Sequence, residues 1–180
     1  MKTDVLILPG YGNSDSKHWQ SLWEASNPNF KRVNQTDWEQ PICGDWTVIL
    51  EEHVKRAGPE VKIVAHSLGC LLLAQWAAQT DLKIAGALLV AVPGPDGKNF
   101  PSQASGFSPI ADTKFDFPSI VVASSNDPYS GLEFSKSCAK NWDSTFIELG
   151  NFGHINSSSG LGNWSEGLKL LAKLRAQTYN

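Results

Sequence analysis

The sequence lacks the markers of disulfide-rich and metal-binding proteins. It contains 3 cysteines in 180 residues, and they stand far apart at Cys43, Cys70 and Cys138. An odd number of widely spaced cysteines argues against a disulfide framework and for a reducing compartment. Neither a C-x-x-C nor an H-E-x-x-H motif occurs. We therefore expect no metal in the functional site.

Long apolar runs and blocks of one charge are also missing. The 15 basic and 18 acidic residues are spread along the chain and give a net charge of -3, so nucleic acid is not an expected partner. The apolar run near the N-terminus covers only residues 5–8 before Pro9. It is too short for a signal peptide or a membrane span. These features predict a soluble cytoplasmic protein that does not bind a membrane. They leave open whether it binds a protein partner.

The residues that are present predict a single α/β domain over residues 1–180, without repeats and without a separate lid domain. Hydrophobic residues make up 41% of the chain, enough for a real core. Apolar runs that predict strands alternate with stretches of helical periodicity, which indicates right-handed crossovers and a parallel sheet. The expected strands cover 5–8, 30–33, 61–65, 84–92, 119–123 and 145–149.

Several details of the connections can also be predicted. Ser16 is a plausible N-cap for the first helix, and Ser130 with Glu133 has the spacing of a capping box. The one long connection, residues 93–118, is rich in Gly, Pro, Ser and Asp. Because long loops in small domains are usually functional or mobile, we expect this loop to shape a pocket.

The most informative motif lies at Ala65-His66-Ser67-Leu68-Gly69. A buried strand precedes it and an almost wholly apolar helix follows, as in the G-x-S-x-G nucleophile elbow of serine hydrolases. The positions two before and two after the serine must be small where strand and helix backbones meet, and alanine and glycine satisfy this. The alternative is that Ser67 is only a helix N-cap after a core strand. Whether an acid and a histidine are placed to act with Ser67 decides between the two interpretations.

An acid and a histidine follow in the order that such an enzyme needs. Asp127 comes directly after the fifth predicted strand, and His154 comes after the sixth. Since the carboxyl ends of parallel strands share one edge of the sheet, both would lie near Ser67. The order Ser, Asp, His is that of α/β-hydrolases. A turn-forming aspartate and a surface-loop histidine are the alternatives, while Asp112 and Asp116 precede the strand and fit less well.

The loop after the first strand is the expected source of an oxyanion donor. We predict the backbone amides of Tyr11 and Leu68 for this role, with Gly12 as second choice to Tyr11. Gly10-x-Gly12 after a strand also resembles a dinucleotide-binding loop, but Asp15 stands at the third glycine position and would repel a pyrophosphate. No cofactor is therefore expected.

The substrate pocket is predicted from the same loop and from aromatic residues near loop edges. Of the 7 tryptophans, three with helical spacing are expected in the core: Trp23, Trp46 and Trp76. The predicted substrate-binding residues are Gly12, Asn13, His18, Trp19, Trp38 and Trp164.

Taken together, the motifs resemble a known family. They are Leu8-Pro9-Gly10-Tyr11-Gly12, His18-Trp19, the elbow, Ser125-Asn126-Asp127-Pro128, Gly153-His154-Ile155-Asn156 and residues 159–167. The chain is similar to the small serine hydrolases of the α/β-hydrolase superfamily that include the retinoblastoma-binding hydrolases and the YdeN-like proteins. Many relatives have histidine where this chain has Pro9, so the resemblance implies the backbone donor role of this loop but not its detailed geometry.

The resemblance implies a minimal three-layer α/β/α α/β-hydrolase fold with six parallel strands in the order 2-1-3-4-5-6. It also implies a Ser67-His154-Asp127 triad that cleaves esters or amides of small acyl substrates. Esterase, thioesterase and amidase activities use the same residues, and an acyl acceptor other than water is a further alternative. A protein-binding scaffold with little catalytic role is the competing hypothesis, because fold does not fix function.

Overall fold

The computed structural model describes residues 3–174 and contains one sheet of six parallel strands. The strand order is β2-β1-β3-β4-β5-β6, as predicted. Each predicted strand is present, with ends that shift by at most one residue, except that β4 is two residues shorter at each end than the range 84–92. The strands are β1 (Val5–Leu8), β2 (Phe30–Arg32), β3 (Lys62–His66), β4 (Gly86–Val90), β5 (Ser119–Ala123) and β6 (Thr145–Glu148).

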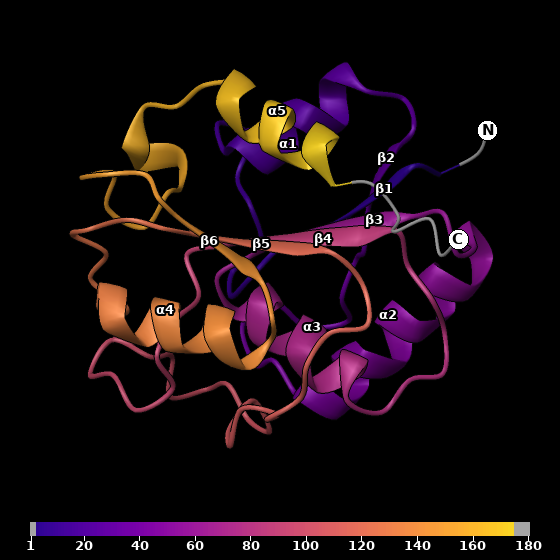
Figure 1. Cartoon of the computed structure of the whole chain (residues 1–180), viewed down its shortest axis with the longest axis horizontal. Helices are drawn as coiled ribbons and strands as arrows, with labels where there is room; N and C mark the ends of the chain where they lie inside the picture. The colour runs from indigo at the N-terminus through magenta and orange to yellow at the C-terminus, as the bar shows by residue number, and fades with distance from the viewer. Residues whose placement is uncertain (1–2, 175–180) are drawn as a thin grey trace.

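Helices cover both faces of this sheet and complete the three layers (Figure 1). Helices α1 and α5 lie on one face, and α2, α3 and α4 lie on the other. The helices are α1 (Trp19–Ser26), α2 (Cys43–Ala57), α3 (Leu68–Ala77), α4 (Leu132–Asn141) and α5 (Ser165–Lys173), with a short 3-10 turn, η1, at Ser157–Ser159. Within residues 3–174, no helix has the length and apolar character that a membrane span requires.

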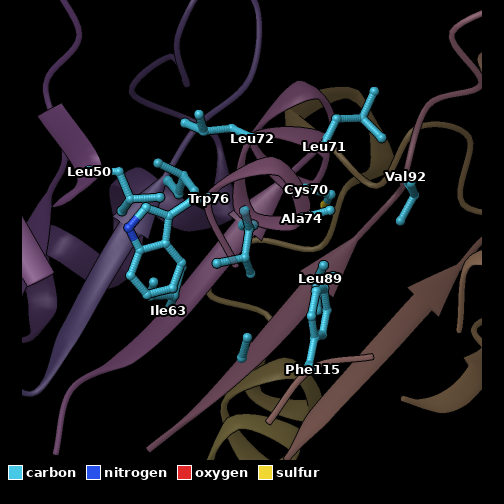
Figure 2. Close-up of a cluster of buried hydrophobic side chains, with 14 of the residues drawn as sticks. Leu50, Ile63, Cys70, Leu71, Leu72, Ala74, Trp76, Leu89, Val92 and Phe115 are labelled. Atoms are coloured by element: carbon cyan, nitrogen blue, oxygen red, sulfur yellow. The ribbon is translucent and has the colours of Figure 1, made fainter. Parts of the chain in front are cut away.

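Helix α3 sits at the centre of the larger core. Nearly all of its residues are buried, and β3 and β4 beneath it are buried too. Figure 2 shows its side chains packed with those of Leu50 from α2 and with Ile63 and Leu89 from the sheet. A strand that is covered on both faces needs apolar residues on both, so this part of the sequence reads as a continuous apolar run. The packing fixes the end of β3 and the start of α3 firmly in place.

Two predicted helix caps were wrong. Helix α1 is capped by His18, whose Nδ1 accepts a hydrogen bond from the amide of Gln20 at 3.1 Å, and not by Ser16. Helix α4 has Gly131 as its N-cap, without a side-chain cap. The hydroxyl of Ser130 donates instead to the carbonyl of Val92 at 2.6 Å. This bond ties the start of α4 to the chain just after β4.

The long connection at 93–118 is held against the body of the protein. Its Phe107 is buried and packs on Trp46, and Ser105 forms a β-bridge with Ile42. The side chain of Asn99 donates to the carbonyl of Pro128 at 2.7 Å. The loop therefore crosses the carboxyl edge of the sheet and adjoins the segment that carries Asp127.

Candidate active site

The turn between β3 and α3 has the geometry of a nucleophile elbow. Ser67 is the only residue between the two elements, and its φ of 53° and ψ of -125° lie outside the common regions for a residue with a side chain. A Cβ on Gly69 would lie 2.4 Å from the carbonyl oxygen of Leu8 and 2.8 Å from that of Pro9. Only glycine fits there. The close contact forces the sharp turn that presents the serine hydroxyl.

The three residues singled out in the sequence meet at the carboxyl edge of the sheet. His154 Nε2 lies 2.8 Å from Ser67 Oγ, and His154 Nδ1 lies 2.9 and 3.0 Å from the two oxygens of Asp127. The Asp127 side chain is 3% exposed and that of His154 is 10% exposed. A carboxylate can only accept, so in the neutral imidazole Nδ1 carries the proton. Nε2 is then free to accept from the serine hydroxyl.

The loop that carries His154 is anchored from the β5 side by short hydrogen bonds. Asn126 Oδ1 accepts from the amide of Gly153 at 2.7 Å, and Ser124 Oγ accepts from the amide of Phe152 at 2.9 Å. The Ser124 hydroxyl in turn donates to Asn126 Oδ1 at 2.9 Å. This side-chain network holds the histidine loop and the aspartate loop in one fixed arrangement.

A second set of anchors reaches the same loop from the other side. His66 Nε2 donates to the carbonyl of His154 at 2.9 Å, and Trp19 Nε1 donates to the carbonyl of Ile155 at 2.8 Å. Ile155 has a φ of 47°, which is unfavourable for a β-branched residue. Such a conformation persists where surrounding contacts impose it. The anchors therefore hold His154 in position at a local backbone cost.

Two further imidazoles lie beside His154 and stay neutral. Ring centroids are 4.9 Å apart between His154 and His66, and 4.7 Å apart between His66 and His18. Burial lowers the pKa of His66 well below 6.5 and lowers that of His18 to about 4. At neutral pH neither ring adds a positive charge beside His154.

The backbone supplies two amides at the mouth of the elbow. A Cβ on Gly10 would lie 2.9 Å from the Cβ of Ser67 and 3.0 Å from the amide nitrogen of Leu68, so the β1 loop touches the elbow. The amide of Gly12 donates to the carbonyl of Trp38 at 3.0 Å. Within residues 3–174, the amides of Tyr11 and Leu68 have no acceptor. This favours Tyr11 over Gly12 as a donor to a bound ligand.

A cavity of about 340 Å³ opens over the serine and the histidine. Four of its lining residues come from the long loop, as expected of a loop that shapes a pocket: Pro93, Asn99, Pro101 and Gln103. The other lining residues are Gly10, Tyr11, Asn13, Asp15, His18, His66, Ser67, Leu68, Tyr129, His154, Asn156 and Ser157. No group of three or more His, Cys, Asp or Glu in the described part of the chain is placed to hold a metal ion.

The predicted pocket residues divide into two groups. Asn13 and His18 line this cavity, whereas Gly12 and the three tryptophans are not among the described residues around it. Trp19 and Trp164 are buried with ring centroids 5.0 Å apart, and Trp38 packs against Trp46. These indole rings fill gaps between layers, where a large apolar side chain contributes most to the core.

Sequence reasoning missed part of the site. Tyr129 packs on the His154 ring with centroids 4.2 Å apart, and its amide donates to Asp127 Oδ1 at 2.9 Å. Its place two residues after Asp127 was the available signal. Asn156 and Ser157, two and three residues after His154, line the cavity as well. Nothing in the local pattern marked the residues of the long loop, because only the tertiary structure brings them here.

Comparison with known proteins identifies the family. A model described as "Serine hydrolase" matches residues 5–173. The chain belongs to this serine hydrolase family. It is 25% identical to YdeN of Bacillus subtilis (strain 168), a protein named as a hydrolase, over 89% of this chain and 90% of that protein.

Solved structures agree with this assignment. A YdeN-like hydrolase from Pectobacterium atrosepticum superposes with a TM-score of 0.83 at 30% identity, covering 96% of this chain and 90% of that one. An esterase from Thermogutta terrifontis superposes with a TM-score of 0.70 at 14% identity, covering 97% and 91%. The second likeness shows the fold alone. The serine hydrolase is thus a small member of the α/β-hydrolase superfamily.

Proposed function

We propose that this serine hydrolase cleaves carboxylic esters or related acyl bonds of small substrates through an acyl-enzyme on Ser67. The observation that carries the proposal is the continuous hydrogen-bonded chain from Ser67 Oγ through His154 to Asp127, with heavy-atom distances of 2.8 to 3.0 Å. A serine hydroxyl needs a base within this range, and the base needs a third group that fixes its tautomer.

Each residue has a definite part in the proposed reaction. His154 Nε2 takes the proton of Ser67 as Oγ attacks the carbonyl carbon, and Asp127 stabilises the imidazolium that forms. The amides of Tyr11 and Leu68 donate to the developing oxyanion. His154 then protonates the leaving group. In the second half-reaction His154 activates water, which attacks the acyl carbon and releases Ser67.

The histidine neighbours support this chemistry. If His66 or His18 were charged, it would disfavour the imidazolium that must form on His154 during each half-reaction. Burial keeps both rings neutral at neutral pH, and the Nε2–H of His66 is committed to the His154 carbonyl. Both rings therefore surround the proposed base without competing for its proton.

Turnover of a p-nitrophenyl ester by the wild type and by Ser67→Ala tests the proposal. We expect the substitution to lower kcat by roughly 10⁶-fold, since the nucleophile and the base act as a unit. Ser125→Ala is a matched control, because its exposed hydroxyl bonds to Glu148 outside the cavity. Near-normal turnover by Ser67→Ala would contradict the proposal.

A further inference from the structure

The walls of the cavity carry two side-chain amides whose orientation is fixed. Asn13 Oδ1 accepts from Arg32 Nη1 at 2.6 Å and from the amide of Ser14 at 2.8 Å, and Asn156 Oδ1 accepts from the amide of Ser158 at 3.0 Å. These partners can only donate, so the identity of each oxygen is settled. The NH₂ groups are consequently on the other side of each amide.

Neither NH₂ group has an acceptor in the part of the chain that the structure describes. Asn13 and Asn156 line the cavity, and no protein acceptor within residues 3–174 bonds to the Nδ2 of either one. Asn13 belongs to the loop after β1, while Asn156 follows the histidine loop by two residues. The two donors thus come from separate loops that flank Ser67 and His154. Two loops that line the cavity therefore each carry an NH₂ group that bonds to no protein acceptor among the described residues.

The charge of the lining disfavours an anionic ligand. Asp15 is a lining residue, and the hydroxyl of Ser157 donates to its Oδ2 at 2.6 Å. That bond is the main cause of a lowered pKa for Asp15, so the carboxylate is ionised at neutral pH. No Lys or Arg stands among the described residues that line the cavity. A carboxylate or phosphate on the substrate would meet a negative charge with no cation to balance it.

The lining also argues against a long alkyl chain. Ligand pockets usually present mostly apolar and aromatic walls, and their volumes run from about 300 to 1,000 Å³. This cavity, at about 340 Å³, is near the lower limit. Apart from its two tyrosines, the lining side chains are mainly amide, hydroxyl and imidazole groups, with two prolines from the long loop. The space suits a short acyl compound with polar atoms.

We propose that the cavity takes a short, neutral acyl compound that carries an acceptor oxygen, such as a hydroxyl, ether or amide carbonyl, and that Asn13 and Asn156 bind this oxygen. The inference rests on the proposed hydrolysis at Ser67. The oxygen belongs either to the acyl part or to the alcohol part of the substrate. The two parts are tested separately.

Isosteric ester pairs test the proposal in each part. p-Nitrophenyl butyrate and p-nitrophenyl methoxyacetate differ by one CH₂ exchanged for oxygen in the acyl part. Pentyl butyrate and 2-ethoxyethyl butyrate differ in the same way in the alcohol part. The measured quantity is the ratio of kcat/KM within a pair. Dividing the ratio of a variant by that of the wild type cancels the intrinsic reactivity of the esters and the fraction of active protein.

Each variant removes the NH₂ group and keeps one structural feature of the asparagine, although Asn13→Gly also removes the Oδ1 acceptor of Arg32 and of the Ser14 amide. Asn156→Ser retains a side-chain acceptor for the Ser158 amide but loses the NH₂ group, and Asn13→Gly suits the φ of 65° at that position. Asn141→Ser, at an exposed position of α4, is the matched control for Asn156→Ser. In both site variants we expect the kcat/KM ratio that favours the oxygen-bearing ester to fall about fivefold in at least one pair, which is the effect of losing one hydrogen bond. The ratio should stay unchanged in the control.

The outcomes separate this proposal from the one on which it rests. Ratios that are unchanged in both pairs, with Ser67-dependent turnover intact, would overturn the assignment of Asn13 and Asn156 alone. A wild type that prefers octanoate to butyrate esters would also overturn it. If none of the four esters is turned over in a Ser67-dependent way, the proposed hydrolysis fails and this inference fails with it.

Discussion

The indole Nε1–H of Trp19 donates to the carbonyl oxygen of Ile155 at 2.8 Å, although the two residues are 136 positions apart in the chain. The bond joins the first helix to the residue that follows His154. Because Ile155 has a φ of 47°, its carbonyl needs an external partner to stay in this orientation. We therefore expect Trp19 to act as a positioning residue for His154.

Replacing Trp19 by phenylalanine removes this donor and keeps most of the buried ring. We expect Trp19→Phe to lower kcat about tenfold, since a misplaced base loses part of its proton-transfer geometry. Trp23→Phe is a close control: Trp23 is equally buried, and its Nε1–H donates to the carbonyl of Asn163 at 2.7 Å, away from the cavity. Esterase rates and thermal melting of both variants check this. Equal losses of kcat in the two would show that Trp19 has no special link to His154.

Asp127→Asn tests the role of the carboxylate. The amide of Tyr129 already donates to Oδ1 of Asp127 at 2.9 Å, so an asparagine would keep its oxygen there and turn its NH₂ toward His154 Nδ1. The imidazole would then carry its proton on Nε2 and could not accept from Ser67. We expect kcat to fall about 10⁴-fold while the fold persists. Asp112→Asn, at the exposed acid before β5, should leave kcat unchanged. A loss of kcat in Asp112→Asn but not in Asp127→Asn would assign the acid of the triad to Asp112 instead.

Gly69→Ala tests the close approach that shapes the elbow. Its Cβ would lie 2.4 Å from a backbone oxygen of β1, and backbone cannot give way as a flexible side chain can. We expect a loss of about 1–3 kcal/mol or more in the free energy of unfolding, together with reduced activity. At Gly44 in α2 an added Cβ meets nothing within 4 Å, so Gly44→Ala should be neutral or stabilise by up to about 1 kcal/mol. Urea denaturation of both variants measures the difference, and equal stabilities would contradict the packing argument.

The buried His18 makes stability depend on pH. Its pKa is about 4 in the folded protein against an ordinary 6.5, because burial disfavours the charged ring. Below pH 6.5 the unfolded chain binds a proton that the folded protein does not bind until about pH 4. This contribution to the free energy of unfolding is complete above pH 6.5 and is lost as the pH falls to 4. At pH 5 the loss amounts to about 2 kcal/mol. Burial of His66 acts in the same direction.

His18→Asn keeps an N-cap acceptor for α1 and removes the titrating ring. We expect the free energy of unfolding of this variant to fall less between pH 7.5 and pH 5 than that of the wild type. His53→Asn, on α2 outside the cavity, controls for the loss of a histidine. An identical pH dependence in His18→Asn and the wild type would contradict the assignment of this effect to His18.

The fold was predictable because its signals are local. Buried strands such as β3 read as short apolar runs, and helix α3 reads as a long one, so their alternation predicted the parallel sheet. The strand order came from the resemblance to the family. The caps were not predictable in the same way. His18 and Gly131 serve as N-caps because of where the chain turns, and the hydroxyl of Ser130 finds a carbonyl 38 positions earlier.

The candidate site was predictable only where residues follow strands. Ser67, Asp127 and His154 each stand just past a strand end, and a parallel sheet brings such positions to one edge. No comparable sequence signal predicts which residues form the wall of the cavity. Asn99 and Gln103 reach it through the path of a loop without helix or strand, and Asn156 reaches it through the turn after His154. The three tryptophans predicted for the pocket pack against other aromatic rings and are not among the described residues around this cavity, since an aromatic ring near a loop edge fits a core as well as a pocket.

The central claim is that Ser67 is acylated during turnover. Incubation of the folded protein with a fluorophosphonate, followed by digestion and mass spectrometry, locates the modified residue. We expect one adduct per chain, on Ser67, with labelling abolished in Ser67→Ala and greatly slowed in His154→Ala. The absence of an adduct on Ser67 in protein that hydrolyses esters would contradict the account, and its absence in folded protein without such activity would favour a binding role for this fold.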